Sequence, residues 1–559
     1  MSQGSYHFEV HGRQAQSWTV QKVCDDRQSA IDSAGTLFKE LSLKAVKVLE
    51  VSFGSDDPVF HDKEIFFQGE KDAPSQASDV DLIGPVCQKI EDLFLPEARQ
   101  SIASLLQKPM AGWKITPLEL LYHGEHLQKL NDTGQILQGA VQRVAISQIQ
   151  KTGQKVNQRV LDLYSLTNEL LQDLKIRGRD GNVVLLEGED LEGLLAKAKK
   201  AENPSLVFMF GVVHFFKEIP SLDLKFEKTL ELIEANDDPE ILGFLDQFLA
   251  DFLYSTENLH KLLGGSENLG KGLLRIIDLI RAEINGGGDG HPALLRINLL
   301  IGRNLLPETK KLLVVKVMSS LKGNASFVKG DPYKSIMFHR RILSRLNVDG
   351  NTHIGGQDSV EAIIQRCSRL TGSVSISEVL NGLEHPLDRV GRLIEVANGV
   401  VGATNLRAVA NYIIPVLESP HNTQIIIENS DDDLKLLKTL SNLQQKIRDT
   451  GFQHFYHEKI LSNLDRIGFE LFKVKKVQNQ LLSSASDKIQ LGFSILGLIA
   501  EDAVPYPQVM GVVRGFAKKI IMSGDFMAEL QKKALDGEAD ADLLKEFYML
   551  LEGSQLGKQ

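Results

Sequence analysis

The alternation of hydrophobic and polar residues at the start of the chain predicts a small α+β module over residues 1–68. Residues 6–10 and 18–23 alternate with the period of two that half-buried strands show, and Gly12 between them predicts a turn. Helical spacing then follows over residues 30–41, and residues 46–51 and 59–67 predict two more strands. The expected order is ββαββ, a four-stranded sheet with one helix on it.

A longer pattern of helical spacing occupies residues 127–174. Its apolar residues recur at steps of three and four with one slip near Gln148, and they are Leu127, Leu130, Leu137, Val141, Val144, Ile149, Val156, Val160, Leu163, Leu170 and Leu174. The pattern predicts an amphipathic helix with a narrow apolar seam, roughly 70 Å long at ~1.5 Å per residue. A helix of that length needs a partner helix, from elsewhere in the chain or from a second copy.

Glycines inside this stretch leave a second interpretation open. Gly134, Gly139 and Gly153 each cost about 1 kcal/mol relative to alanine in a helix interior. Gly153 also lies close to the slip in the pattern, so the stretch is either one long helix or two helices folded back as a hairpin. Because few charge pairs flank the seam, a core helix of a bundle is a better interpretation than a dimeric coiled coil.

The rest of the chain is predicted to be almost wholly helical. A polar, proline-bearing linker at residues 69–79 precedes a helical segment at 80–190, in which a helix pair over 80–107 breaks at Pro96 and a small hairpin lies at 179–186. Two helical domains, 191–346 and 358–559, then meet at the loop 347–357. The breaks between helices show no fixed period, so we expect a mainly α fold with a large irregular helical array and no recognised solenoid repeat.

Composition and charge exclude several classes of protein. The chain has 559 residues, of which 42% are hydrophobic and 24% charged, which is typical of globular domains. A net charge of -10 argues against binding to duplex nucleic acid, and the short basic patch at Lys473, Lys475 and Lys476 is better explained as a solvated helix face.

Cysteine usage and hydropathy indicate the compartment. Three cysteines without a CxxC pair argue against a disulfide framework, and the first residues do not resemble a secretion signal. The most apolar run, residues 206–216, is much shorter than the ~20 residues that cross a bilayer. We therefore expect a soluble cytoplasmic protein.

One segment approaches a nucleotide-binding motif. Gly265, Gly270 and Lys271 fit the G-x-x-x-x-G-K part of a phosphate-binding loop, but Gly272 stands where a serine or threonine would hold magnesium. The motif also follows a predicted helix instead of a buried strand. A glycine-rich turn between two helices explains it.

Metal and calcium motifs are incomplete. His123 and His126 are three residues apart, as are His454 and His457, yet each pair lacks a third ligand in sequence, so surface or core-edge histidines are the better interpretation. The loop that starts at Asn347 and Asp349 has no glycine at the sharp turn and no bidentate glutamate. No catalytic, cofactor or metal residues are therefore assigned, and no cofactor is expected.

The sequence favours a non-catalytic cytoplasmic scaffold or regulatory protein that acts through helix-mediated protein–protein contacts. The expected contact is a protein partner, or self-association, through the seam at residues 127–174, with no membrane and no nucleic acid. The alternative is a small-molecule or metal-binding helical protein, or an enzyme of this kind, that uses the histidine pairs or Lys271.

Overall fold

The structure is a computed structural model that describes residues 5–13, 18–24, 26–40, 43–54, 57–69, 84–179, 184–285, 291–430, 432–475, 477, 481–482, 485, 487–535 and 540–556. The chain divides into two compact units. One comprises residues 1–83 and 142–159, and the other, here named the helical unit, comprises residues 84–141 and 160–559.

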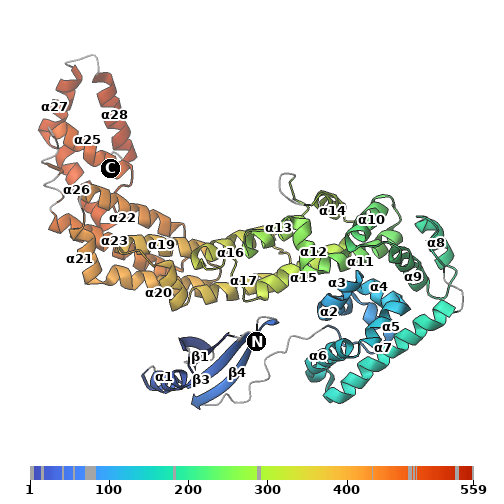
Figure 1. Cartoon of the computed structure of the whole chain (residues 1–559). Helices are drawn as coiled ribbons and strands as arrows, with labels where there is room; N and C mark the ends of the chain where they lie inside the picture. Colours follow the sequence, from blue (N-terminus) through green and yellow to red (C-terminus); the bar gives the residue numbers. More distant parts are fainter. Residues whose placement is uncertain are drawn as a thin grey trace. The chain divides into compact units, whose positions relative to one another are not determined.

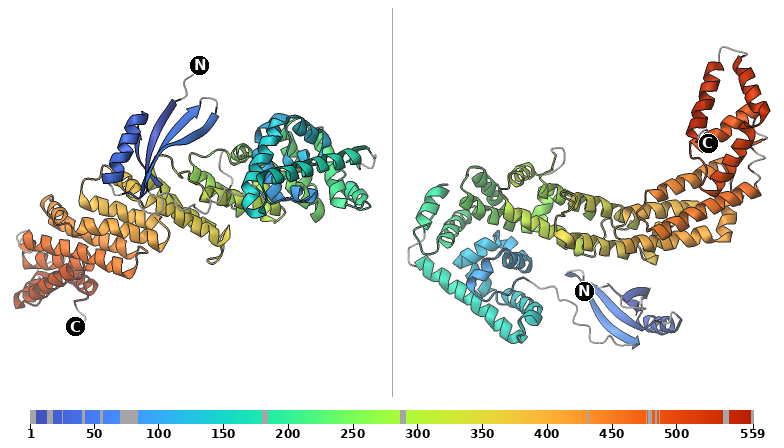
Figure 2. Two further views of the ribbon diagram at one scale, coloured as in Figure 1. Left: turned by 90° about the horizontal axis from the view of Figure 1, so that it is seen from below. Right: turned by 180° about the vertical axis from the view of Figure 1, so that it is seen from behind.

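The first unit contains the predicted ββαββ module. Its elements are β1 (Ser5–Arg13), β2 (Trp18–Cys24), α1 (Arg27–Glu40), β3 (Ala45–Gly54) and β4 (Asp57–Gly69). All neighbouring strands are antiparallel, in the order β2-β1-β3-β4, and α1 packs on the sheet (Figure 2). Phe8, Val10, Val46 and Val48 of the sheet bury their side chains against Ala30 and Ala34 of α1, so the period-two pattern points into this core.

The prediction of a turn at Gly12 is wrong. Gly12 lies inside β1, opposite Thr19 of β2 and Val46 of β3. A Cβ atom at this position would lie 2.7 Å from Leu43 and 2.9 Å from Gln21. The glycine therefore reflects a close approach of neighbouring side chains and not a chain reversal.

The rest of the described chain is helical (Figure 1). The helices are η1 (Ile90–Phe94), α2 (Pro96–Leu105), α3 (Gln107–Trp113), α4 (Pro117–Tyr122), α5 (Gly124–Asp132), α6 (Gln135–Thr152), α7 (Val156–Arg179), α8 (Leu191–Ala198), α9 (Pro204–Lys217), α10 (Leu222–Glu234), α11 (Pro239–Tyr254), α12 (Thr256–Leu263), α13 (Leu269–Ile280), α14 (Ala293–Gly302), α15 (Pro307–Lys322), α16 (Pro332–Leu346), α17 (Gly356–Leu370), α18 (Ser373–Val379), α19 (Pro386–Gly399), α20 (Ala403–Glu418), α21 (Pro420–Glu428), α22 (Asp433–Arg448), α23 (His454–Val474), α25 (Lys488–Ala500), α26 (Gln508–Ile521), α27 (Gly524–Leu535) and α28 (Asp540–Gly553). The mainly α fold with a small amino-terminal α+β module is confirmed.

The seam region does not form one continuous helix. It is divided into α5, α6 and α7, and a glycine with positive φ lies at each break: Gly134 at 55° and Gly153 at 67°. Left-handed backbone is accessible to glycine at little cost, so these residues end the helices that precede them. The break near Gly153, which the interpretation as two helices requires, is confirmed. The end of α6 contacts the start of α7, where Arg159 Nε donates to Gln148 Oε1 at 2.9 Å.

Two layers of helices stack along the helical unit (Figures 1 and 2). Helices α13, α16, α19 and α22 pack in succession in one layer, and α11, α15, α17, α20, α23 and α26 pack in succession in the other. The layers are joined by the pairs α13–α15, α16–α17, α19–α20 and α22–α23. This stack is named the helical array below. Its steps have unequal lengths in residues, which is why a fixed period was not found in the sequence.

Buried polar side chains cap helix ends across neighbouring helices of the array. Asp246 of α11 accepts hydrogen bonds from the first turn of α15, and Asp465 of α23 accepts from the backbone N–H groups of Gln508 (2.8 Å) and Val509 (3.1 Å) in α26. At the other end of α15, Arg366 of α17 donates to the carbonyl oxygens of Ser320, Leu321, Gly323 and Ala325. These contacts satisfy backbone groups that a helix leaves unpaired at its ends.

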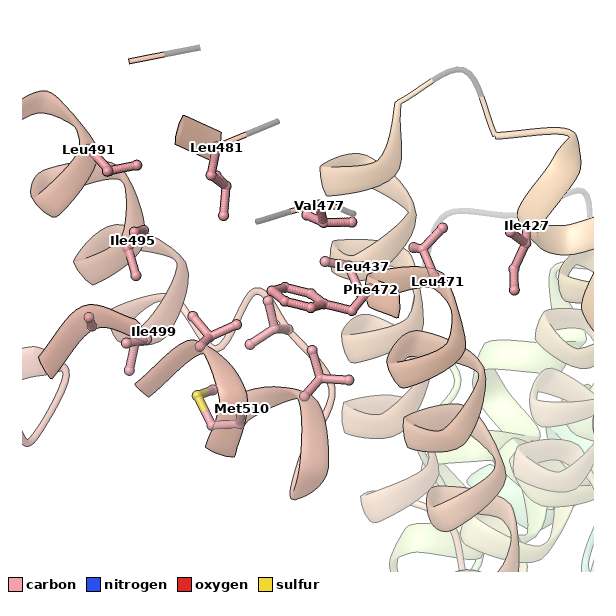
Figure 3. Close-up of a cluster of buried hydrophobic side chains, with 14 residues drawn as sticks. Ile427, Leu437, Leu471, Phe472, Val477, Leu481, Leu491, Ile495, Ile499 and Met510 are labelled. Atoms are coloured by element: carbon pink, nitrogen blue, oxygen red, sulfur yellow. The ribbon is translucent and has the colours of Figure 1, made fainter. Parts of the chain in front are cut away.

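The carboxyl-terminal helices share an apolar core. Leu437 of α22, Phe472 of α23, Ile495 of α25 and Met510 of α26 all lie in one buried cluster (Figure 3). Fully burying a leucine- or phenylalanine-sized side chain contributes about 1.5–3 kcal/mol, so such clusters, and not intrinsic helix propensity, hold the helices together.

Three predictions about the connections have different outcomes. The prediction of a helix over residues 80–95 is wrong for the described part of that range, because residues 84–89 are not helical and only the short 3-10 helix η1 follows them. The linker at 70–79 and the turn of the hairpin at 180–183 lie outside the described residues. The loop 347–357 connects α16 to α17, which pack on each other, and the domain boundary there stays a prediction. Among the described helices, none is both long and apolar enough to cross a bilayer.

Candidate functional site

The seam residues are used inside the protein's own fold. Seven of its side chains are buried, and they are Leu127, Leu130, Leu137, Val141, Leu163, Leu170 and Leu174. Val144, Ile149, Val156 and Val160 are partly buried. A partner cannot contact the seven buried side chains without unfolding this part of the chain.

The near-match to a phosphate-binding loop lies between two helices, as the sequence analysis expected. It connects α12 to α13, and Asn268 caps α13 by accepting a hydrogen bond from the Lys271 backbone N–H at 2.9 Å. The Lys271 ammonium pairs with Glu267 one turn earlier, with Nζ 2.5 Å from the carboxylate. The Lys271 ammonium is therefore paired with a carboxylate of the turn that precedes α13.

The calcium-like loop and Lys473 of the basic patch also have structural explanations, whereas Lys476 lies outside the described residues. The Asp349 carboxylate accepts hydrogen bonds from the backbone N–H groups of Asn351 and Thr352 and from the Thr352 hydroxyl, and these bonds lower the pKa of Asp349. Lys473 lies over the Phe469 ring at 4.2 Å, on one face of α23. The Asp349 carboxylate therefore stabilises its own loop, and the Lys473 ammonium packs on a ring of its own helix.

The two histidine pairs have different surroundings. His454 is exposed and His457 partly buried at the start of α23. His123 and His126 lie with their ring centroids 4.6 Å apart, and a third histidine, His214 of α9, lies 5.1 Å from His123. The sequence pattern gives no sign of His214, because it lies 88 positions after His126 and only the packing of α9 on α4 brings it close to His123.

Burial favours the neutral rings of His123 and His126 by lowering the pKa of each. His123 is 4% exposed and its Nδ1 has no hydrogen-bond partner among the described residues. Burial lowers the pKa of His123 to about 4, and the nearby His126 and Lys217 act in the same direction. Within the described ranges, no group of three or more histidine, cysteine or acidic residues has a geometry that could hold a metal ion.

A cleft in the helical unit is a second candidate site. Its volume is about 370 Å³, and it lies among α2, α3, α10, α11, α12 and α15. Its apolar lining includes Met110, Ile115, Leu222 and Phe252. Its polar lining contains three lysines (Lys114, Lys261, Lys316), three carboxylates (Asp223, Asp251, Glu257), six hydroxyl side chains (Ser104, Thr116, Ser221, Tyr254, Ser255, Thr256) and the amides of Gln107 and Asn258.

Lys316 of α15 lies partly buried in this cleft. Its ammonium donates to the backbone carbonyl of Tyr254 and lies 4.1 Å from the centre of the Tyr254 ring. Burial lowers the pKa of Lys316 to about 8. No carboxylate among the described residues forms an ion pair with it, so its charge is compensated only by a carbonyl dipole and an aromatic face.

Two carboxylates of the cleft lining, Asp251 and Glu257, are already paired with other groups. The side chain of Asp251 is buried, and its carboxylate accepts hydrogen bonds from Arg99 Nε at 3.1 Å and from the Leu118 backbone N–H at 3.0 Å. Glu257 lies 3.5 Å from Lys261 on the exposed side of α12. Deeper in the unit, Glu119 and Lys225 form an ion pair of 2.5 Å, with side-chain exposures of 2% and 4%.

Comparison with known proteins does not identify a family for this chain. The sequence matches no protein-family model and no curated protein.

Proposed function

We propose that this protein is a scaffold or regulatory protein that acts through protein–protein contacts of its helical unit. The observation that supports the proposal is the two-layered helical array from α11 to α26. Stacked helix pairs present long, continuous surfaces, and proteins built this way commonly use those surfaces to bind other macromolecules. A cytoplasmic location is part of the same proposal.

The contact surface differs from the one that the sequence suggested. Because seven seam side chains are buried, a partner has to bind exposed side chains instead. Helix α14 offers Leu295 and Leu299, which are 44% and 62% exposed and lie one turn apart on one face. Leucines at this spacing on an exposed helix face are suitable for contact with an apolar surface of a partner protein.

The test is affinity capture of the full-length protein at its native abundance, followed by reconstitution. Each captured protein is identified, purified and mixed again with the purified chain, and the complex is measured by analytical ultracentrifugation. We expect at least one purified protein to bind directly. Replacing both Leu295 and Leu299 by Glu should weaken that complex by roughly tenfold or more, because a charge is placed in an apolar contact.

A matched control separates a specific contact from a general effect of added charge. Val374 of α18 is 72% exposed, so Val374→Glu adds charge at another exposed apolar position. The control should bind as the wild type does. The proposal is contradicted if the purified chain stays monomeric and none of the captured proteins binds it again.

A further inference from the structure

The cleft around Lys316 has the size and lining of a small-molecule site. Its volume of about 370 Å³ lies within the range of roughly 300–1,000 Å³ that is typical of ligand pockets. Its lining combines apolar side chains with hydrogen-bond donors. Such a mixture suits a ligand with an apolar body and one polar group.

The charge of Lys316 determines which polar group fits. A partly buried ammonium without a carboxylate partner is unfavourable, and an anion beside it would replace the missing countercharge. The carboxylate of Asp251 does not serve this purpose, because Arg99 and the Leu118 backbone N–H already occupy it.

Further donors surround the same space. Ser221 and Ser255 cap α10 and α12 by accepting hydrogen bonds through Oγ, from the backbone N–H groups of Leu224 (3.2 Å) and Asn258 (3.5 Å). Accepting such a bond leaves the hydroxyl proton of each serine available for donation. Lys114 adds a second exposed ammonium. Asp223 is the opposing charge, and it is exposed in the first turn of α10, where water screens it.

We propose that the cleft binds a small organic anion, a carboxylate or phosphate monoester on an apolar body, whose charged group pairs with Lys316. The apolar body lies against Met110, Ile115 and Phe252. This binding does not depend on the scaffold function.

Isothermal titration calorimetry of the full-length chain tests the proposal with defined probes. The probes are phenyl phosphate, benzoate and inorganic phosphate, with benzyl alcohol as a neutral analogue. We expect saturable one-site binding of phenyl phosphate or benzoate, weaker binding of inorganic phosphate and none of benzyl alcohol. Lys316→Met should weaken binding by roughly tenfold to a hundredfold, because it removes a charge-assisted hydrogen bond.

Two further variants keep the result interpretable. Lys310→Met changes a lysine of the same helix that does not line the cleft, and it should leave the affinity unchanged. Lys114→Asn retains a side chain that tolerates the positive φ of 59° at this position, and it should weaken binding about two- to fivefold. If Lys316→Met does not fold, Lys114→Asn still provides a test.

A chemical readout is independent of any variant. Acetic anhydride acetylates neutral amines, so bound phenyl phosphate should suppress acetylation of Lys316, measured by mass spectrometry, and leave Lys310 unaffected. The proposal is overturned if no anionic probe saturates the chain, if benzyl alcohol binds equally well, or if Lys316→Met binds like the wild type. Binding of acidic peptides alone would also overturn it, and would assign the cleft to a protein partner.

Discussion

Asp246 connects two helices of the array, and its replacement tests how the array is held together. It is fully buried in the middle of α11. Its carboxylate accepts hydrogen bonds from the Glu308 backbone N–H (2.6 Å), the Thr309 backbone N–H (3.1 Å) and the Thr309 hydroxyl (2.6 Å). The N-cap residue of α15 is Leu306, whose side chain cannot accept a hydrogen bond, so Asp246 provides the cap from another helix.

Asp246→Ala removes the acceptor of all three donors. A buried donor without a partner costs about 1–3 kcal/mol, and partial access of water reduces the sum, so we expect a loss of about 3–5 kcal/mol in the free energy of unfolding. The matched control is Asp238→Ala. Asp238 is partly exposed, is the N-cap of α11 and accepts hydrogen bonds from the backbone N–H groups of Glu240 and Ile241. Losing an ordinary N-cap costs about 1 kcal/mol.

The pH dependence gives a second test of Asp246. Burial raises its pKa to about 6, although its hydrogen bonds lower it. A raised folded-state pKa means that this carboxyl adds stability below pH 3.8, its unfolded value, and that the contribution disappears as pH rises through 6. The stability difference between wild type and Asp246→Ala should therefore grow as pH is lowered from 7 to 4.

Stacked arrays need not unfold in one step, so urea denaturation has to be combined with a local measurement. Amide hydrogen exchange in the first turn of α15 reports the cap directly, and we expect faster exchange there in Asp246→Ala. The reasoning is refuted if Asp246→Ala and Asp238→Ala lose the same stability, or if exchange in α15 does not change.

Three further predictions concern other buried groups. Replacing Glu119 by Gln or Lys225 by Met should each cost about 3–5 kcal/mol in the free energy of unfolding. The double variant Glu119→Gln with Lys225→Met should cost less than the sum of the two single losses, because glutamine still accepts from the Thr116 backbone N–H and no unpaired charge remains. Losses that add up fully in the double variant would contradict a coupled buried pair. In α25, Gly492→Ala should destabilise the protein by about 1–3 kcal/mol, because the new Cβ would lie 2.5 Å from the buried ring of Phe526. Gly497→Ala in the same helix should stabilise it by about 0.5–1 kcal/mol, because no atom lies within 4 Å of the new Cβ. Thermal unfolding temperatures that shift in the same direction for both variants would contradict this packing. Because the pKa of His123 is lowered in the folded protein, its contribution to stability is complete above pH 6.5 and is lost as pH falls to about 4. The free energy of unfolding of His123→Asn should therefore depend less on pH between 6.5 and 4 than that of the wild type. An unchanged slope in this range would count against a buried neutral ring.

Local patterns predicted the amino-terminal module well. Strand alternation around Phe8 and Val48 and helical spacing around Ala34 correspond to the residues that form its core. The seam pattern identified buried positions such as Leu127 and Leu170 but not the number of helices. Spacing reports which face of a helix is apolar, whereas the breaks depend on the backbone conformation at glycine.

The candidate sites could not be predicted to the same extent. The near-match at Lys271 was correctly explained as a turn between helices. His214, however, joins His123 only through the packing of helices that are distant in sequence. Lys316 looks like any surface lysine of an amphipathic helix, and only the surrounding helices reveal that it is partly buried without a carboxylate. Sequence spacing carries no information about such long-range neighbours.

The scaffold function is tested most directly by hydrogen–deuterium exchange of the full-length chain, alone and in complex with a partner captured at native abundance. We expect the partner to slow exchange in consecutive helices of the helical unit, with α14 among them. Protection confined to the amino-terminal β1–β4 module, or no protection in α14 and in the helical array, would contradict the scaffold function.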